Sequence, residues 1–190
     1  IREFVVPYLL WFAYVPFGLI YLGFHSKRDF YKLFLALCGG MAVANIAFGV
    51  FPNAQGLRPA IHSDDPFSTM IRFIYATDTP TDVCPSLHVI DAVAINAALR
   101  HSAAFSQKRC RRAASSVFSL LICLSTVCIK QHAVVDVFWG AITAALFCVP
   151  LYIIPAHRRR LDVPPKEPAP AHAEAECPAG CAGKGSEAFP

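Results

Sequence analysis

The sequence is organised around residues 125–136, STVCIKQHAVVD, which interrupt a long apolar run at 117–154. They place a cation (Lys130), an imidazole (His132) and a carboxylate (Asp136) among apolar neighbours. Ionisable side chains at membrane depth are costly, so each is a hypothesis for a functional site. Residues four apart share one face of a helix, so we expect Asp136 to lie within hydrogen-bonding reach of His132 and to orient it. The alternative is a buried histidine with a structural role only.

The composition is typical of a membrane protein. Of the 190 residues, 55% are hydrophobic and only 16% are charged, whereas a soluble domain has about a quarter charged residues. We therefore expect an all-α integral membrane helical bundle at 1–160, followed by a low-complexity, disordered tail at 161–190. The first residue is Ile1 and not Met, and we expect that the parent protein has a further helix before it. The modest formal charge of +4 does not indicate a nucleic-acid partner.

Apolar runs predict about five transmembrane helices. These runs lie at 4–24, 33–51, 85–99, 113–129 and 134–154; a helix of about 20 residues crosses the hydrocarbon core. The third run is short and contains Asp91 and Asn96, so we expect it to face other helices and not lipid. The segment 52–84 is the one long connection, and it includes a short amphipathic piece at 67–75.

Clusters of Lys and Arg predict the orientation in the membrane. The polar loops expected at 25–32 and 101–112 and the segment after residue 155 are all basic, and five spans place them on one side. Basic loops face the cytoplasm. We therefore expect a plasma or inner membrane protein with a cytoplasmic C-terminus. The long connection, the start of the third span and the turn before Val134 then meet on the extracytoplasmic side.

Side chains that suit a phosphate group gather at this predicted outer surface. Arg58 offers a planar fork and Lys130 a mobile charge, while Ser86 precedes a helix N-terminus, whose free N–H groups favour an anion. His88 and His132 add a nucleophile and a proton donor. The sequence has no carboxylate cluster of the kind that binds metals, so we expect chemistry without a metal or cofactor.

Three short motifs resemble those of the type-2 phosphatidic acid phosphatase superfamily. Residues 85–88, PSLH, are similar to its Pro-Ser-Gly-His motif, and Ser125…His132…Asp136 is similar to its Ser-Arg-x5-His-x3-Asp motif, at the same spacing. Residues 58–59, Arg-Pro, resemble the end of its first motif. The three occur in the family's order, and as a set they are specific.

This resemblance implies a membrane phosphatase that acts on a lipid phosphate or pyrophosphate within the surrounding membrane lipids. His132 would attack phosphorus and become a phosphohistidine, Asp136 would orient His132, and His88 would protonate the leaving oxygen. Arg58, Ser86 and backbone N–H groups would hold the phosphoryl oxygens.

The sequence departs from the family pattern at three positions. Phe51 stands where the first motif begins with Lys, Thr126 where the third has Arg, and Leu87 where the second has Gly. We hypothesise that Lys130 replaces one missing cation. The Leu87 and Thr126 pattern is nearest to the branch that includes inositol phosphorylceramide synthase, so a head-group phosphotransferase is one alternative. A non-catalytic membrane protein with a degenerate site is the other. The lipid and the oligomeric state are not specified by these motifs.

Overall fold

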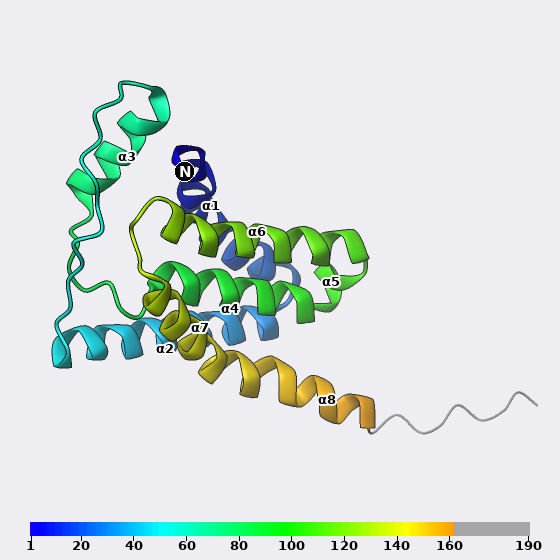
Figure 1. The fold of residues 1–190 in the computed structure, drawn as a ribbon. Coiled ribbons are helices and arrows are strands. Elements are labelled where there is room, and N and C mark those ends of the chain that lie inside the picture. Colours follow the sequence, from blue (N-terminus) through cyan, green and yellow to red (C-terminus); the bar gives the residue numbers. More distant parts are fainter. Residues whose placement is uncertain (162–190) are drawn as a thin grey trace, which may run out of the picture.

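The computed structural model describes residues 1–161, and helices make up almost all of that part of the chain (Figure 1). The elements are η1 (Arg2–Phe4), α1 (Val5–His25), α2 (Lys27–Val50), α3 (Pro66–Thr77), α4 (Leu87–His101), α5 (Ala103–Ser106), α6 (Arg109–Cys128), α7 (Val134–Cys148), the π-helical turn η2 (Val149–Ile153) and α8 (Ile154–Leu161). Within 1–161 the only β-type pairing is one bridge between Ala54 and Thr81. The all-α prediction is confirmed. The expected tail falls outside the described residues, apart from Leu161 at the end of α8.

Helix α4 forms the centre of the bundle. It packs against α1, α2, α6 and α7, and in Figure 1 it runs beside α6. Its Ile90 and Ile95 are fully buried. Glycines let the neighbouring helices approach closely, because a Cβ at Gly40 would lie 2.5 Å from Cγ2 of Ile90 and one at Gly18 would lie 2.7 Å from Cγ2 of Ile95. Small residues at helix contacts are the usual way in which membrane helices gain close packing.

Four segments are long and apolar enough to cross a membrane. They are Arg2–His25, Lys27–Val50, Arg109–Cys128 and Val134–His157, so the protein is a membrane protein. Helix α4, which we expected to be the third of five spans, has 15 residues. At 1.5 Å per residue it reaches only about 22 Å, less than the roughly 30 Å hydrocarbon core. The count of five spans therefore stays a prediction.

Two expected loops are largely helical instead. The polar loop predicted at 25–32 is a single extended residue, Ser26, whose hydroxyl accepts a hydrogen bond from the backbone N–H of Asp29 (3.3 Å) and caps α2. The basic loop predicted at 101–112 contains α5 and the first turn of α6. Both predictions were wrong for one reason: polar residues in the first turn of a helix look like loop residues in a hydropathy profile.

The bundle has two chemically different ends. At one end, here called the histidine end, α4 and α7 begin and α6 ends (Figure 1). The connection 51–86, which includes α3, also lies at this end. At the other end, here called the basic end, α2 begins, α4 ends and α8 follows η2. Segments far apart in sequence therefore meet at each end.

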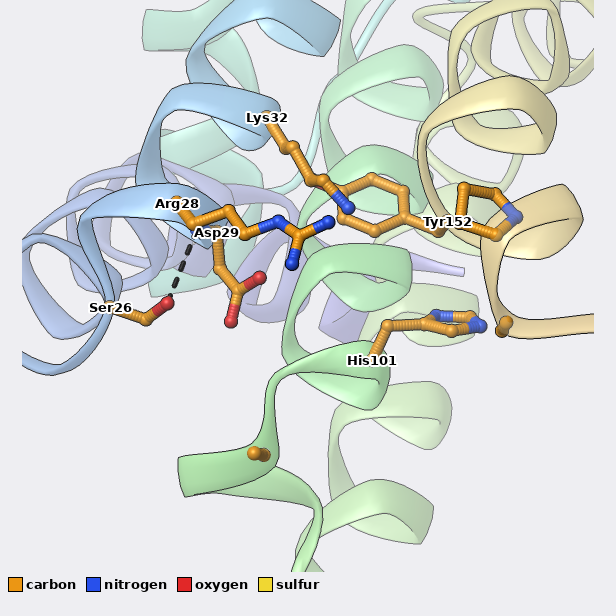
Figure 2. A pocket seen from close by; sticks show the side chains of 9 residues that line it. Ser26, Arg28, Asp29, Lys32, His101 and Tyr152 are labelled. Carbon is orange, nitrogen blue, oxygen red and sulfur yellow. Dashed lines mark hydrogen bonds between the residues drawn. The ribbon is translucent and has the colours of Figure 1, made fainter. Parts of the chain in front are cut away.

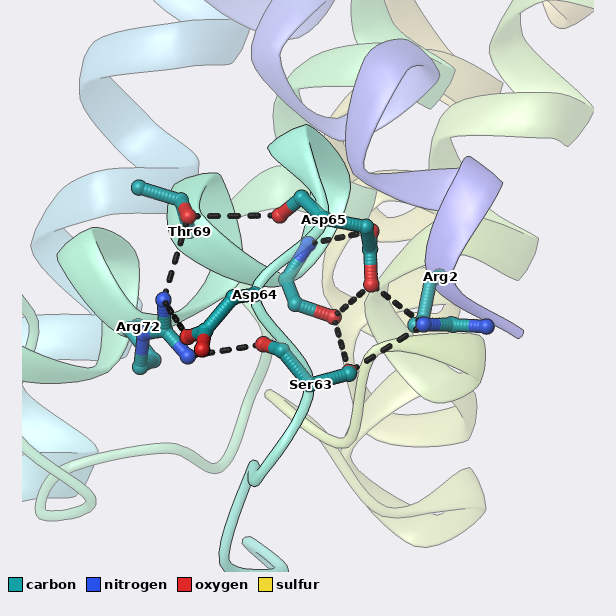
Figure 3. Close-up of polar contacts among 7 residues, drawn as sticks. Arg2, Ser63, Asp64, Asp65, Thr69 and Arg72 are labelled. Atoms are coloured by element: carbon teal, nitrogen blue, oxygen red, sulfur yellow. Dashed lines mark hydrogen bonds and ion pairs between the residues drawn. The ribbon is translucent and has the colours of Figure 1, made fainter.

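Polar contacts fix α3 at the histidine end (Figure 3). Asp65 caps this helix, accepting hydrogen bonds from the backbone N–H (3.0 Å) and the hydroxyl (2.7 Å) of Ser68, and these bonds hold the pKa of Asp65 well below its usual range. The same carboxylate pairs with Arg2 of η1. Asp64 pairs with Arg72 at 3.2 Å. The amphipathic piece expected at 67–75 is thus a helix tied to the start of the bundle.

Candidate active site

Three sequence-predicted residues come together at the histidine end from two parts of the chain. His88 lies in the first turn of α4, His132 lies in the turn between α6 and α7, and Asp136 lies in the first turn of α7. The turn is closed by the carbonyl oxygen of Thr126, which accepts hydrogen bonds from the backbone N–H groups of Gln131 (2.9 Å) and His132 (3.0 Å). This closure holds the His132 backbone against the end of α6.

Asp136 faces the His132 ring. Its Oδ2 lies 3.7 Å from Nδ1 of His132, and the two side chains are only 8% and 10% exposed. This is an ion-pair distance, longer than a hydrogen bond. The spacing predicted that the two residues share one helix face, and this was wrong because His132 precedes α7. Oδ2 of Asp136 also accepts a hydrogen bond from the backbone N–H of Ala133 (2.7 Å) at the start of this helix. Nδ1 of His132 is buried and has no hydrogen-bond partner, and the Asp136 carboxylate is the nearby group of opposite charge.

His88 is held between aromatic rings. Its ring stacks on Tyr8 (4.6 Å between centroids) and lies 4.4 Å from the Trp11 ring, both from α1. It meets the His132 ring edge to face at 5.6 Å. The buried Nε2 of His88 and Nε1 of Trp11 have no hydrogen-bond partner. Buried polar atoms without partners are rare, and here two of them belong to neighbouring rings, one of which contacts His132.

Ser86 supplies another unpaired donor at the start of α4. It is fully buried, its hydroxyl has no partner, and its backbone N–H donates to the carbonyl of Asp136 (3.2 Å). The first N–H groups of a helix have no acceptor within the helix. The hydroxyl of Ser86 and the start of α4 together form a site suited to an oxyanion.

A glycine in α7 allows this arrangement. A Cβ added at Gly140 would lie 2.9 Å from the backbone oxygen of Ser86 and 3.0 Å from Cβ of Val89. The obstacle includes backbone, which cannot rotate away as a side chain would. The close contact of α7 with the start of α4 therefore requires the absence of a side chain at this position.

We expect Gly140→Ala to lower the free energy of unfolding by about 1–3 kcal/mol, because overpacking forces the two helices apart. The matched control is Gly49→Ala in α2, where nothing lies within 4 Å of the added Cβ. That change should be neutral or stabilising by up to about 1 kcal/mol. The measurement is denaturant unfolding in detergent. Equal effects of the two substitutions would contradict the close packing at Gly140.

Arg58 lies next to the site but is bound to the protein. Its guanidinium donates to Oε1 of Gln131 (2.5 Å) and to the backbone oxygens of Asp78 (2.5 Å) and Tyr75 (3.2 Å), and it lies 4.9 Å from the centre of the Tyr75 ring. Its Nε is buried without a partner. Gln131 precedes His132, so Arg58 reaches the turn that carries the proposed nucleophile, while no direct hydrogen bond links it to either histidine within 1–161.

A polar network that the sequence did not reveal extends from Arg58 to His88. Nε2 of Gln131 donates to Oδ2 of Asp78 (3.2 Å), and the hydroxyl of Tyr8, which stacks on His88, donates to the same oxygen (3.5 Å). The position of Gln131 beside His132 was the only sequence signal for it. From the sequence, a turn residue and a residue that shapes the substrate entrance were equally good interpretations of Asp78.

Lys130 lies apart from the two histidines. Its side chain is exposed and lines a cavity of about 310 Å³ between residues 59–63 and the end of α6. Its backbone is left-handed (φ 60°). In the described part of the chain no hydrogen bond or ion pair joins Lys130 to His88, His132 or Asp136.

Two of the three departures from the family pattern, Phe51 and Thr126, stand where the family has a cation. Phe51, at the end of α2, is 73% exposed. Thr126 is fully buried, and its hydroxyl donates to the carbonyl of Cys123 (2.8 Å). Neither residue supplies a cation or a free donor to the site. Within 1–161 no group of three or more His, Cys, Asp or Glu side chains is placed to hold a metal ion.

No protein-family model, curated protein or solved structure matches this chain.

Proposed function

We propose that this protein is an integral membrane phosphatase that hydrolyses a lipid phosphate or pyrophosphate through a phosphohistidine. One observation carries the proposal: two histidines from separate elements meet at 5.6 Å, one backed by Asp136 and the other beside the start of α4. The expected membership of the type-2 phosphatidic acid phosphatase superfamily rests on the three motifs, and it is part of the proposal.

In the first step, Nε2 of His132 attacks phosphorus and the bond from phosphorus to the leaving oxygen breaks. His88 gives its proton to that oxygen, and the freed lipid alcohol, or lipid phosphate, departs. The Asp136 carboxylate beside Nδ1 stabilises the positive charge that develops on the imidazole. His88 and Asp136 both lie close to His132 and come from different helices, which suits these separate roles.

In the second step, water attacks the phosphohistidine and the P–N bond breaks. His88, now neutral, accepts the proton of the water, and inorganic phosphate leaves with His132 restored. In both steps the hydroxyl of Ser86, the first N–H groups of α4 and Nε of Arg58 stabilise the phosphoryl oxygens. Such positioned donors are the main source of catalysis in phosphoryl transfer.

The test is phosphate release from a panel of lipid phosphates and pyrophosphates in detergent with EDTA present. We expect release that EDTA does not reduce. Release that EDTA abolishes would contradict the metal-free mechanism. No release, together with transfer of a phosphoryl head group from a diacyl phospholipid to an alcohol, would support the phosphotransferase alternative. No turnover of either kind would indicate the degenerate, non-catalytic protein.

Two hypotheses about the phosphate-binding cation, Arg58 or Lys130, predict opposite effects of substitution at these residues. Because Arg58 contacts the turn of His132 and Lys130 lines a separate cavity, we expect Arg58→Gln to lower kcat/KM by roughly a hundredfold. Lys130→Asn, which tolerates the left-handed backbone, should lower it less than about threefold. The hypothesis that Lys130 replaces a missing cation predicts a large loss in Lys130→Asn, so steady-state kinetics of the two variants decides between them.

We also propose that the histidine end is extracytoplasmic and the basic end cytoplasmic, in a plasma or inner membrane. The support is the positive charge of the basic end. Native Cys84 is a poor probe, because burial and the nearby Asp136 raise the pKa of its half-buried thiol. Gly56 is better, since its added Cβ meets nothing within 4 Å.

We expect a membrane-impermeant thiol reagent, applied to intact cells, to label Gly56→Cys and not the exposed native Cys110. Peptide mapping by mass spectrometry identifies the labelled residue. Permeabilised cells provide the control, in which both thiols should react. Labelling of Cys110 in intact cells would reverse the proposed orientation.

A further inference from the structure

The basic end carries a polar cavity that the proposed reaction does not use. It has a volume of about 390 Å³, which lies within the range of small-ligand sites. Its walls come from the start of α2, the end of α4 and the region where η2 passes into α8 (Figure 2). The proposed active site lies at the other end of α4 (Figure 1).

The walls of this cavity are mainly cationic. Arg28, Lys32 and His101 line it together with one carboxylate, Asp29. Figure 2 shows these four side chains around the same space. The two permanent cations exceed the single anion even when His101 is neutral. The cavity therefore favours an anionic ligand.

A buried hydroxyl is the second observation that indicates a ligand. Tyr152 lines the cavity and is 3% exposed, and its hydroxyl has no hydrogen-bond partner. An unpaired buried hydroxyl costs about 1–3 kcal/mol, and a bound acceptor oxygen would remove that cost. Nζ of Lys32 lies over the Tyr152 ring, 5.6 Å from its centre, and donates a hydrogen bond to the backbone oxygen of Leu151 (3.0 Å).

Basic side chains also line a neighbouring cavity. Arg100, Arg112 and His157 line this second space of about 440 Å³, which shares His101 and Ala156 with the first. Among the residues that the structure describes, its lining includes no acidic side chain. The positive charge therefore continues from the first cavity over the end of α4, which suits an anion with more than one negatively charged oxygen.

We infer that the cavity lined by Arg28, Lys32, His101 and Tyr152 is a second phosphate-binding site, separate from the histidine end. A guanidinium fork, an ammonium and a hydroxyl match the several oxygens of a phosphate group. Two sources carry this chemistry: the headgroup of an anionic phospholipid in the adjacent leaflet, and free phosphate in the water. A headgroup is held by the membrane at the level of the helix ends, where anionic lipids attract basic side chains.

The test measures binding, and it does not depend on catalysis. The full chain in neutral detergent is titrated with phosphatidylglycerol, and bound lipid is counted by native mass spectrometry, with inorganic phosphate as competitor. We expect Arg28→Gln to weaken binding about tenfold and Tyr152→Phe, which keeps the ring beside Lys32, to weaken it about threefold. Competition by millimolar phosphate would identify free phosphate as a ligand of the same site; absence of competition would identify the headgroup.

Two controls make the result specific. Lys27→Gln removes an exposed cation that lies next to Arg28 in the sequence and does not line the cavity. Arg58→Gln alters the histidine end, so any lipid binding lost in this variant is assigned to the histidine end and not to the second site. Both variants should retain the affinity of the second site. Equal weakening by Lys27→Gln and Arg28→Gln, or no weakening by Arg28→Gln and Tyr152→Phe, would overturn the inference without bearing on the proposed hydrolysis.

Discussion

His132→Ala is expected to lower phosphate release by at least about a thousandfold, because the change removes the proposed nucleophile. Asp136 and Ser86 would remain, but in the proposed mechanism they orient His132 and bind the phosphoryl oxygens and do not attack phosphorus. The measurement is the steady-state rate of phosphate release from the best lipid substrate of the wild-type protein.

The control for His132→Ala is His25→Ala at the basic end. His25 is exposed, and its Nδ1 lies 2.8 Å from the backbone oxygen of Tyr21 in its own helix. This variant should retain wild-type activity. The unfolding midpoint of each variant in detergent shows whether it is folded. A folded His132→Ala protein with more than about a tenth of wild-type activity would exclude nucleophilic catalysis by His132.

His88→Gln is expected to reduce hydrolysis of a lipid phosphate by about a hundredfold to ten-thousandfold, the usual contribution of a general acid or base. Glutamine fills part of the space between Tyr8 and Trp11 but transfers no proton. With nitrophenyl phosphate, whose phenolate leaves without a proton, the first step should survive. The second step still needs a base, so turnover should stop after a stoichiometric burst of nitrophenolate.

The burst is measured by stopped-flow absorbance. The matched control is the double variant His88→Gln with His132→Ala, which should show no burst because no histidine accepts the phosphoryl group. A burst that persists in the double variant would assign the nucleophile to another residue. Equal losses of lipid phosphate and nitrophenyl phosphate turnover, with no burst, would exclude His88 as the general acid.

The helical spans were predictable because their signal is local. Runs of about 20 apolar residues produced α1, α2, α6 and the α7–α8 region. The central position of α4 was indicated by Asp91 and Asn96, which suit protein contacts better than lipid. The connections at Ser26 and at α5 were not predictable from hydropathy, because it does not distinguish the polar first turn of a helix from a loop.

The candidate site was predictable only where its residues lie near each other in sequence. His132 and Asp136 are four residues apart and lie close together, although His132 precedes α7 and the two do not share one helix face. Ser86 and His88 both lie at the start of α4. Tyr8 and Trp11 come from α1, far away in the chain, and only tertiary packing brings them onto His88. Lys130 lies two residues before His132 in the sequence, and its side chain lines the cavity next to residues 59–63. Its role as a replacement cation stays a prediction that the Lys130→Asn kinetics test.

The central claim is a covalent phosphate on His132. The direct measurement is rapid alkaline quenching of the wild-type protein and the His88→Gln variant with nitrophenyl phosphate, followed by peptide mapping by mass spectrometry, because phosphohistidine is labile in acid. The proposed mechanism predicts phosphate on His132, at higher occupancy in His88→Gln than in the wild type. Phosphate on another residue, or none in either protein while nitrophenolate is released, would contradict it.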